Sequence, residues 1–111
     1  MTEGPQNFSE FWPHYVLAHS EAWTRIFHFT GTLAGWTLLA LAIFLRRPWL
    51  LPAALLTPYA FAWISHFFIE HNRPASFDHP LWSWIGDQKM FMMVLAGRMG
   101  KELKRCREAD S

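Results

Sequence analysis

Two long stretches of the chain carry apolar residues without any charged side chain. The first runs from Ile26 to Leu45 and the second from Pro48 to Ile69, and only Arg46 and Arg47 separate them. Each stretch is about as long as a helix must be to cross the ~30 Å hydrocarbon layer of a bilayer. A connection this short makes the two helices antiparallel neighbours. The pattern therefore predicts a membrane-embedded helical hairpin.

Amphipathic segments flank this hairpin. Before it, apolar residues recur at the spacing of one helix face: Phe8, Phe11, Trp12, Tyr15, Val16 and His19. Asn7 and Glu10 resemble a capping box at its start. After it, Asn72-Arg73-Pro74 is expected to end the second span, because proline disfavours helix in the residue before it. A second stripe from Pro80 onward predicts an interfacial or partly inserted helix that runs into a basic tail.

The predicted fold class is therefore all-α, an integral membrane hairpin with an amphipathic helix on either side. We expect a single membrane domain over 1–111, with helices at 8–22, 26–45, 49–70 and 80–105. The N-terminus lacks the basic region and short apolar core of a signal peptide, so the internal segments must direct insertion. Arg46 and Arg47 lie at one end of the spans, and a larger number of basic residues lies at the other end. Because basic residues are enriched on the cytoplasmic side, we expect both termini in the cytoplasm. The membrane would be a bacterial inner membrane or the endoplasmic reticulum.

Composition adds few constraints to this picture. The net charge of +1 gives no strong field for nucleic acid, and the basic tail is interpreted as a solvated or lipid-facing helix. A single cysteine, Cys106, cannot form an internal disulfide or a thiolate metal site by itself. Seven tryptophans and ten phenylalanines suit the membrane–water interface, where aromatic rings are enriched.

The histidines are the residues most indicative of chemistry. His28 is the third residue of the first apolar stretch, and His66 lies three residues before the end of the second. An antiparallel hairpin therefore places both at one depth on one side of the membrane. His19 lies just before the first span, and Glu70 follows His66 by four residues on the same helix face. Two rings that share an ion with bonds near 2 Å must lie within ~10 Å of each other.

Polar groups at membrane depth are costly and tend to face one another or an ion. Three imidazoles and a carboxylate suit iron, zinc or manganese, and two histidines with one carboxylate are typical of Fe(II) oxygenases. Glu70 is either a ligand or a group that orients a ligating imidazole. Arg73 either meets lipid phosphate or clamps a substrate carboxylate. His14, His71 and His79 are left out of the site.

One small-residue motif has two readings. Gly31 and Gly35 form a GxxxG in the first span, a pattern that marks close approach of two helices. Packing within the hairpin explains it as well as a homodimer does.

Several of these residues occur in strings with a family resemblance. The strings are Phe11-Trp12-Pro13 through His19, His28-Phe29-Thr30-Gly31-Thr32, Trp63 through Ala75, Pro80-Leu81-Trp82-Ser83 and Gly86-Asp87. Together they resemble the 2-hydroxy fatty acid dioxygenase-like membrane family over about Phe8 to Met99. The most specific string is His-x3-Glu-x2-Arg-Pro-Ala, here His66, Glu70, Arg73, Pro74 and Ala75. The chain is shorter than the characterised branch of that family. His71 stands where the family commonly has Lys, and Ser65 where it has Gly.

The resemblance implies an Fe(II)-dependent step of fatty acid α-oxidation, in which a 2-hydroxy acid loses its carboxyl carbon. By the same resemblance His19, His28, His66 and Glu70 would bind Fe2+, and Arg73 would pair with the carboxylate of a fatty-acid-like lipid. The acyl chain would lie either between the spans or in lipid, and Asp87 is a candidate outer partner of the site.

Two other functions compete with this one. A non-enzymatic membrane adaptor or scaffold would use the same polar cluster structurally and bind no metal. A di-iron lipid hydroxylase or desaturase needs about eight histidines in HxxxH and HxxHH boxes, and this chain has six histidines and neither box.

Overall fold

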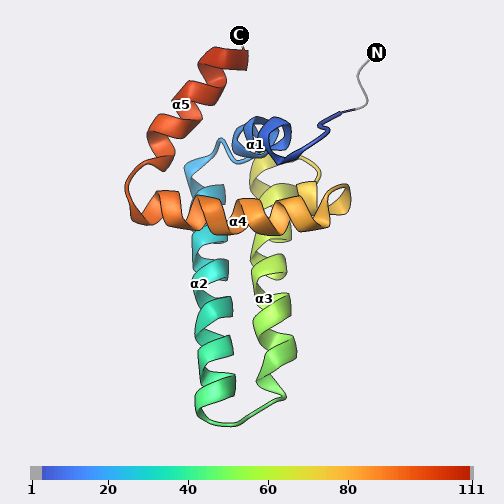
Figure 1. Cartoon of the computed structure of the whole chain (residues 1–111), viewed down its shortest axis with the longest axis vertical. Helices are drawn as coiled ribbons and strands as arrows, with labels where there is room; N and C mark the ends of the chain where they lie inside the picture. Colours follow the sequence, from blue (N-terminus) through green and yellow to red (C-terminus); the bar gives the residue numbers. More distant parts are fainter. Residues whose placement is uncertain (1–3, 111) are drawn as a thin grey trace. The chain divides into compact units, whose positions relative to one another are not determined.

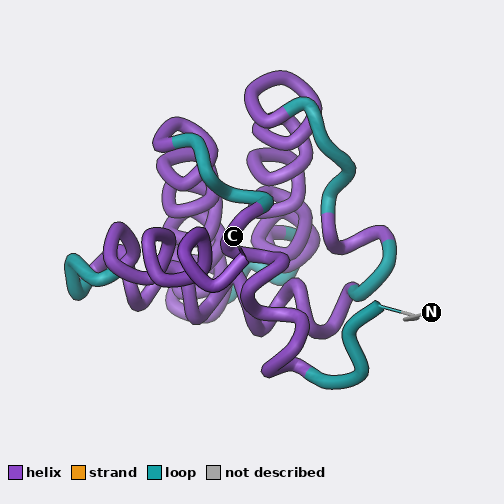
Figure 2. Tube along the Cα trace, turned by 90° about the horizontal axis from the view of Figure 1, so that it is seen from above, coloured by secondary structure: helices purple, strands orange, loops and turns teal. Residues whose placement is uncertain are grey.

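The computed structural model describes residues 4–110, and this part of the chain consists of helices joined by loops and turns, without a strand (Figure 2). The predicted all-α class is confirmed. The chain divides into two compact units. One is made of the residues up to Ser20 together with those from Ala75 onward, and the other is Glu21–Pro74.

The Glu21–Pro74 unit is built from α2 (Ala22–Phe44), α3 (Leu50–Ser65) and a π-helical turn, η1 (His66–Glu70). Within this unit α2 and α3 run side by side in opposite directions and are joined at one end by a short turn (Figure 1). Helix α2 begins at Ala22, before the charge-free stretch, and so includes Arg25.

Small residues allow α2 to approach α3. A Cβ atom on Gly31 would lie 2.7 Å from Cβ of Phe61, and one on Gly35 would lie 2.6 Å from Cγ of Pro58. Both separations are shorter than real Cβ contacts, so these two positions require glycine. The GxxxG motif therefore serves packing between α2 and α3.

The turn between α2 and α3 is a Schellman motif. The N–H of Arg47 donates to the carbonyl of Ala42 (2.9 Å), and the N–H of Arg46 donates to that of Ile43 (3.3 Å). Arg46 has φ 54°, in the left-handed region that usually favours glycine. Two consecutive residues thus reverse the chain and satisfy the last carbonyls of α2.

In the part of the chain that the structure describes, two helices are long and apolar enough to cross a membrane, namely Ala22–Phe44 and the continuous α3–η1 segment Leu50–Glu70. Only 28% and 22% of their most apolar windows are buried. Large apolar side chains on them are widely exposed, Ile43 by 70% and Phe44 by 86%. Water is a poor environment for so much contiguous apolar surface.

The other unit contains α1 (Phe8–Leu17), a short 3-10 turn η2 (Ala75–Phe77), α4 (Pro80–Leu95) and α5 (Met99–Asp110). The cap expected at α1 is present, because Oδ1 of Asn7 accepts the N–H of Glu10 at 2.9 Å. The glutamate carboxylate accepts from the N–H of Gln6, where a capping box would use the N–H of Asn7. Helix α1 ends at Leu17, sooner than the 8–22 segment expected.

The predicted helix over 80–105 is divided in two. Gly97 has φ 71°, and its N–H donates to the carbonyl of Val94 (3.1 Å) while the N–H of Arg98 donates to that of Met93 (2.8 Å). This is a second Schellman motif, which ends α4 and lets α5 begin at Met99. The hydrophobic stripe alone did not reveal the break, because apolar residues continue on both sides of the glycine.

The core of this unit joins α1 to α4 and α5. Its buried members are Phe11, Trp12, Tyr15, Val16, Met90, Met99, Leu103 and Cys106. The indole N–H of Trp12 donates to the carboxylate of Glu102, which also accepts two bonds from Arg105 (2.9 and 2.7 Å). The ammonium of Lys89 lies 4.3 Å above the Trp12 ring, a cation–π contact.

Candidate metal centre

Two buried histidines meet at one end of the α2–α3 pair. His28 lies near the start of α2, and His66 is the first residue of η1. Their ring centroids are 5.1 Å apart, with the ring planes nearly perpendicular. The exposed fractions of the two residues are 4% and 2%. This separation is well within the ~10 Å that a shared ion requires.

The backbone one turn earlier orients the His28 ring. Nδ1 of His28 lies 3.1 Å from the carbonyl oxygen of Thr24, and a carbonyl can only accept, so Nδ1 carries the proton. The hydroxyl of Ser65 lies 3.3 Å from the same nitrogen and donates its own proton to the carbonyl of Ala62 (2.7 Å). The neutral imidazole therefore has its lone pair on Nε2.

His66 is held by Asn72 in a comparable way. Nδ1 of His66 lies 2.7 Å from Oδ1 of Asn72, an oxygen that accepts, so this Nδ1 is again the protonated nitrogen. The N–H of Asn72 donates to the carbonyl of His66 at 2.9 Å. This double contact depends on His71, whose φ of 58° ends the π turn and brings Asn72 back toward His66. Single π turns are frequent at functional sites.

The third histidine, His19, follows the end of α1. Its Nδ1 lies 2.5 Å from the carbonyl oxygen of Tyr15, one of the carbonyls that a helix end leaves without a partner. The His19 and Tyr15 rings stack with centroids 4.1 Å apart. His19 is fully buried. Its proton too is on Nδ1, which leaves the lone pair on Nε2.

Tyr15 is itself fixed by α4. Its hydroxyl donates to the carboxylate of Asp87, and its ring packs against Gly86, where an added Cβ would lie 3.1 Å from the ring. Burial raises the pKa of Asp87 to about 7, and the bond from Tyr15 partly offsets this. Burial and the neighbouring carboxylate raise the pKa of Tyr15. Asp87, expected as an outer partner, thus contacts the residue that holds His19.

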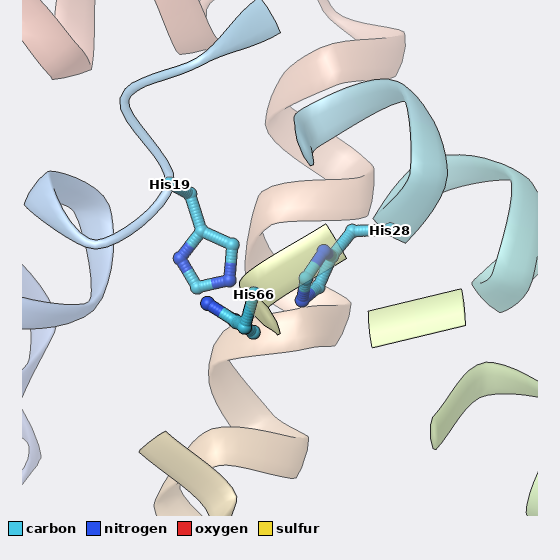
Figure 3. A group of neighbouring side chains, drawn as sticks. All are labelled: His19, His28 and His66. Atoms are coloured by element: carbon cyan, nitrogen blue, oxygen red, sulfur yellow. The ribbon is translucent and has the colours of Figure 1, made fainter. Parts of the chain in front are cut away.

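His19, His28 and His66 form a group that could hold a metal ion, with one ring nitrogen of each within 4.8 Å of the others (Figure 3). Three neutral imidazoles, each with Nδ1 bonded to an oxygen, are the form in which histidine binds iron or zinc. The residues fit a metal ion.

Glu70 and Arg73 are not members of this group. Oε2 of Glu70 accepts the backbone N–H of Glu21, the N-cap residue of α2, at 2.6 Å. A carboxylate at this position also interacts favourably with the positive end of the helix dipole. Arg73 is exposed, in the segment that follows η1.

The three histidines left out of the predicted site are not members of the group that could hold a metal. His14 and His71 are exposed. The His79 ring contacts Phe11 and stacks on Trp82, at centroid distances of 5.4 and 4.9 Å.

Sequence reasoning missed the groups that orient the three rings. Asn72 was interpreted only as part of a helix stop, and the carbonyls of Tyr15 and Thr24 were not considered. A usable signal existed for the carbonyls, since each lies four residues before its histidine, one helical turn away. No comparable rule predicts Asn72, because its position depends on the π turn and on the left-handed His71.

The fold and this site define an all-helical protein with two helices able to span a membrane and a buried histidine group able to hold a metal. The chain belongs to the 2-hydroxy-palmitic acid dioxygenase Mpo1-like family, which it matches over residues 5–99. The family recognised from the histidine strings is thereby confirmed. No curated protein and no solved structure matches the chain. The matched region ends where α5 begins.

Proposed function

We propose that this protein is an Fe(II)-dependent dioxygenase of the membrane that shortens 2-hydroxy fatty acids by one carbon. The observation that carries the proposal is the state of the three buried imidazoles. Each has its Nδ1 proton committed to an oxygen acceptor, so three Nε2 lone pairs are available to one ion. The family name supports a 2-hydroxy fatty acid as the substrate class.

In this proposal His19, His28 and His66 hold the iron. A bound Fe(II) would supply the Lewis acidity and the electrons for dioxygen chemistry that side chains cannot supply. Glu70 serves either as a further ligand or as the group that fixes the start of α2, the helix that carries His28. Its bond to the backbone of Glu21 favours the second role. The carbonyls of Tyr15 and Thr24 and the amide of Asn72 keep the rings in the ligating tautomer.

The remaining residues bind the substrate and exclude water. Arg73 pairs its guanidinium with the substrate carboxylate, which its planar fork matches well. The acyl chain lies along the exposed apolar faces of α2 and α3, in contact with membrane lipids. Burial of His28 and His66 keeps bulk water from the reacting end of the substrate.

The proposal includes a membrane arrangement. Helix α2 and the α3–η1 segment cross the bilayer as an antiparallel pair, and both termini lie on the cytoplasmic side. Their length, their apolar composition and their exposed side chains support this arrangement.

Metal analysis of the detergent-purified protein tests the proposal. We expect about one iron per chain in the wild type, a strong loss in His66→Ala, and retention in His14→Ala, which changes an exposed histidine outside the group. The iron-loaded wild type should convert 2-hydroxypalmitic acid to the acid one carbon shorter, measured by mass spectrometry. Equal, near-zero iron in all three proteins would overturn the proposal and favour the adaptor or scaffold.

A further inference from the structure

One buried hydroxyl near the histidines has no hydrogen-bond partner. Among the described residues, the buried side-chain oxygens in this condition are Oγ1 of Thr24 and Oγ of Ser83. Thr24 is fully buried. A threonine in a helix can bond the carbonyl three or four residues earlier. For Thr24 the residue four positions earlier is Ser20, which precedes the N-cap Glu21 and lies outside the helix.

The position of Thr24 relates this hydroxyl to the metal centre. Thr24 and His28 are four residues apart on α2 and so share one helix face. Side chains in a helix lean toward its N-terminus, which brings the His28 ring over Thr24. The bond from Nδ1 of His28 to the Thr24 carbonyl confirms this closeness. Thr24, whose hydroxyl has no partner, is therefore one helical turn from a histidine of the metal group.

We propose that the Thr24 hydroxyl is the hydrogen-bond partner of the 2-hydroxyl group of the substrate and selects hydroxylated acids. This inference rests on the proposed function. A buried hydroxyl is unfavourable while it has no partner, and a ligand that supplies one removes this cost. Threonine both donates and accepts, which matches a hydroxyl group better than it matches a carboxylate.

The proposed contact explains discrimination between acids. A plain fatty acid would leave the Thr24 hydroxyl unpaired, whereas a 2-hydroxy acid would satisfy it. Sites built to bond a substrate hydroxyl reject the analogue that lacks it, because the protein group is then buried without a partner.

Binding to the zinc-loaded full-length protein tests this inference without turnover, since zinc has no redox chemistry. The dissociation constants of 2-hydroxypalmitic acid and palmitic acid are measured in detergent by calorimetry. Thr24→Val removes the hydroxyl at nearly constant shape, and Thr24→Ser retains it. Thr32→Val is the matched control, because Thr32 is another buried threonine of α2 at the same spacing beyond His28.

We expect Thr24→Val to weaken binding of the 2-hydroxy acid roughly tenfold, with binding of palmitic acid unchanged. Thr24→Ser and Thr32→Val should bind both acids like the wild type. Unchanged binding of the 2-hydroxy acid in Thr24→Val, together with an equal or higher melting temperature, would overturn this inference and leave the proposed function intact. The Thr24 hydroxyl would then be a buried group without a role in binding. Wild-type protein that binds neither zinc nor either acid would overturn the proposed function and this inference with it.

Discussion

The three histidines of the metal group are oriented in the same way, by a hydrogen bond from Nδ1 to an oxygen. Each donates its Nδ1 proton to an oxygen supplied locally, at positions four residues before or six residues after the ring. Orientation thus comes from short-range bonds, and the fold must only bring three pre-oriented rings together. Removal of acceptors of this kind typically lowers metal affinity or activity.

Asn72 is the acceptor that a single substitution tests best. Asn72→Ala removes the oxygen that receives the Nδ1 proton of His66, so the ring is free to rotate or to change its tautomer. We expect iron affinity to fall about 10- to 100-fold. Asn72→Asp keeps an acceptor oxygen and should stay close to the wild type. Competition with a chelator measures both, and wild-type affinity in Asn72→Ala would contradict the role assigned to Asn72.

Asp87 predicts a pH dependence of stability. Its pKa is raised by burial from 3.8 to about 7, so between these values the folded state holds a proton that the unfolded chain releases. This contribution to the free energy of unfolding is complete below about pH 4 and is lost as the pH rises through about 7. We expect Asp87→Asn, which stays neutral, to lack this decline.

Unfolding midpoints of the metal-free protein at about pH 5 and about pH 8 measure the effect. Asp78→Asn, at an exposed aspartate, is the control and should follow the wild type. A decline of the same size in Asp87→Asn and in the wild type would show that another group causes it.

At the level of helices, the contact between α2 and α3 determines whether His28 and His66 meet. Gly31 and Gly35 face Phe61 and Pro58 without room for a methyl group. The π turn then places His66 at the end of α3 where α2 begins. Any change that widens the contact should separate the two rings.

Gly35→Ala tests this contact. The added methyl group would lie 2.6 Å from Cγ of Pro58 and 3.1 Å from the carbonyl oxygen of Ala54, so the helices must move apart. We expect the free energy of unfolding in detergent to fall by about 1–3 kcal/mol, together with weaker iron binding.

Gly100→Ala is the matched control, because nothing lies within 4 Å of the added atom and the residue belongs to helix α5. It should raise the free energy of unfolding by about 0.5–1 kcal/mol. A destabilisation of equal size at both positions would show that the effect does not arise from the α2–α3 contact.

For the whole molecule, the membrane arrangement makes a topological prediction. If the two long helices cross the bilayer, the turn at Arg46 and Arg47 lies on the side opposite to both termini. In a Cys106→Ser background, we expect Gln6→Cys and Lys104→Cys to react with an impermeant maleimide from one side of sealed vesicles. Arg47→Cys should react only from the other side. Labelling of all three positions from one side would exclude the two-span arrangement.

Helix α5 extends the chain beyond the region shared with the family. The family match ends at Met99, yet Met99, Leu103 and Cys106 belong to the buried core of the unit that contains α1, α4 and α5. The bond from Trp12 to Glu102 ties α5 to α1. Helix α5 therefore contributes to the packing of α1, the helix whose end carries His19.

Much of this protein could be predicted from the order of its residues. The all-helical class followed from the two charge-free stretches and the amphipathic segments, and the family followed from the histidine strings. The Asn7 cap was visible as well. These features depend on spacing along one helix or on short strings, so no knowledge of distant contacts was needed to find them.

Other features depend on backbone conformation and on contacts between helices, and only the tertiary structure revealed them. The division of 80–105 at Gly97 and the π turn at His66 arise from local geometry that hydrophobic periodicity does not record. The bond from Tyr15 to Asp87 joins residues far apart in sequence, and only packing of α1 on α4 creates it. The sequence by itself indicated which imidazoles could share an ion, because the positions of His28 and His66 in the two spans and of His19 on a helix face can be read from spacing alone. Only the folded chain decided that Asn72 holds His66, because this distance depends on how the π turn closes.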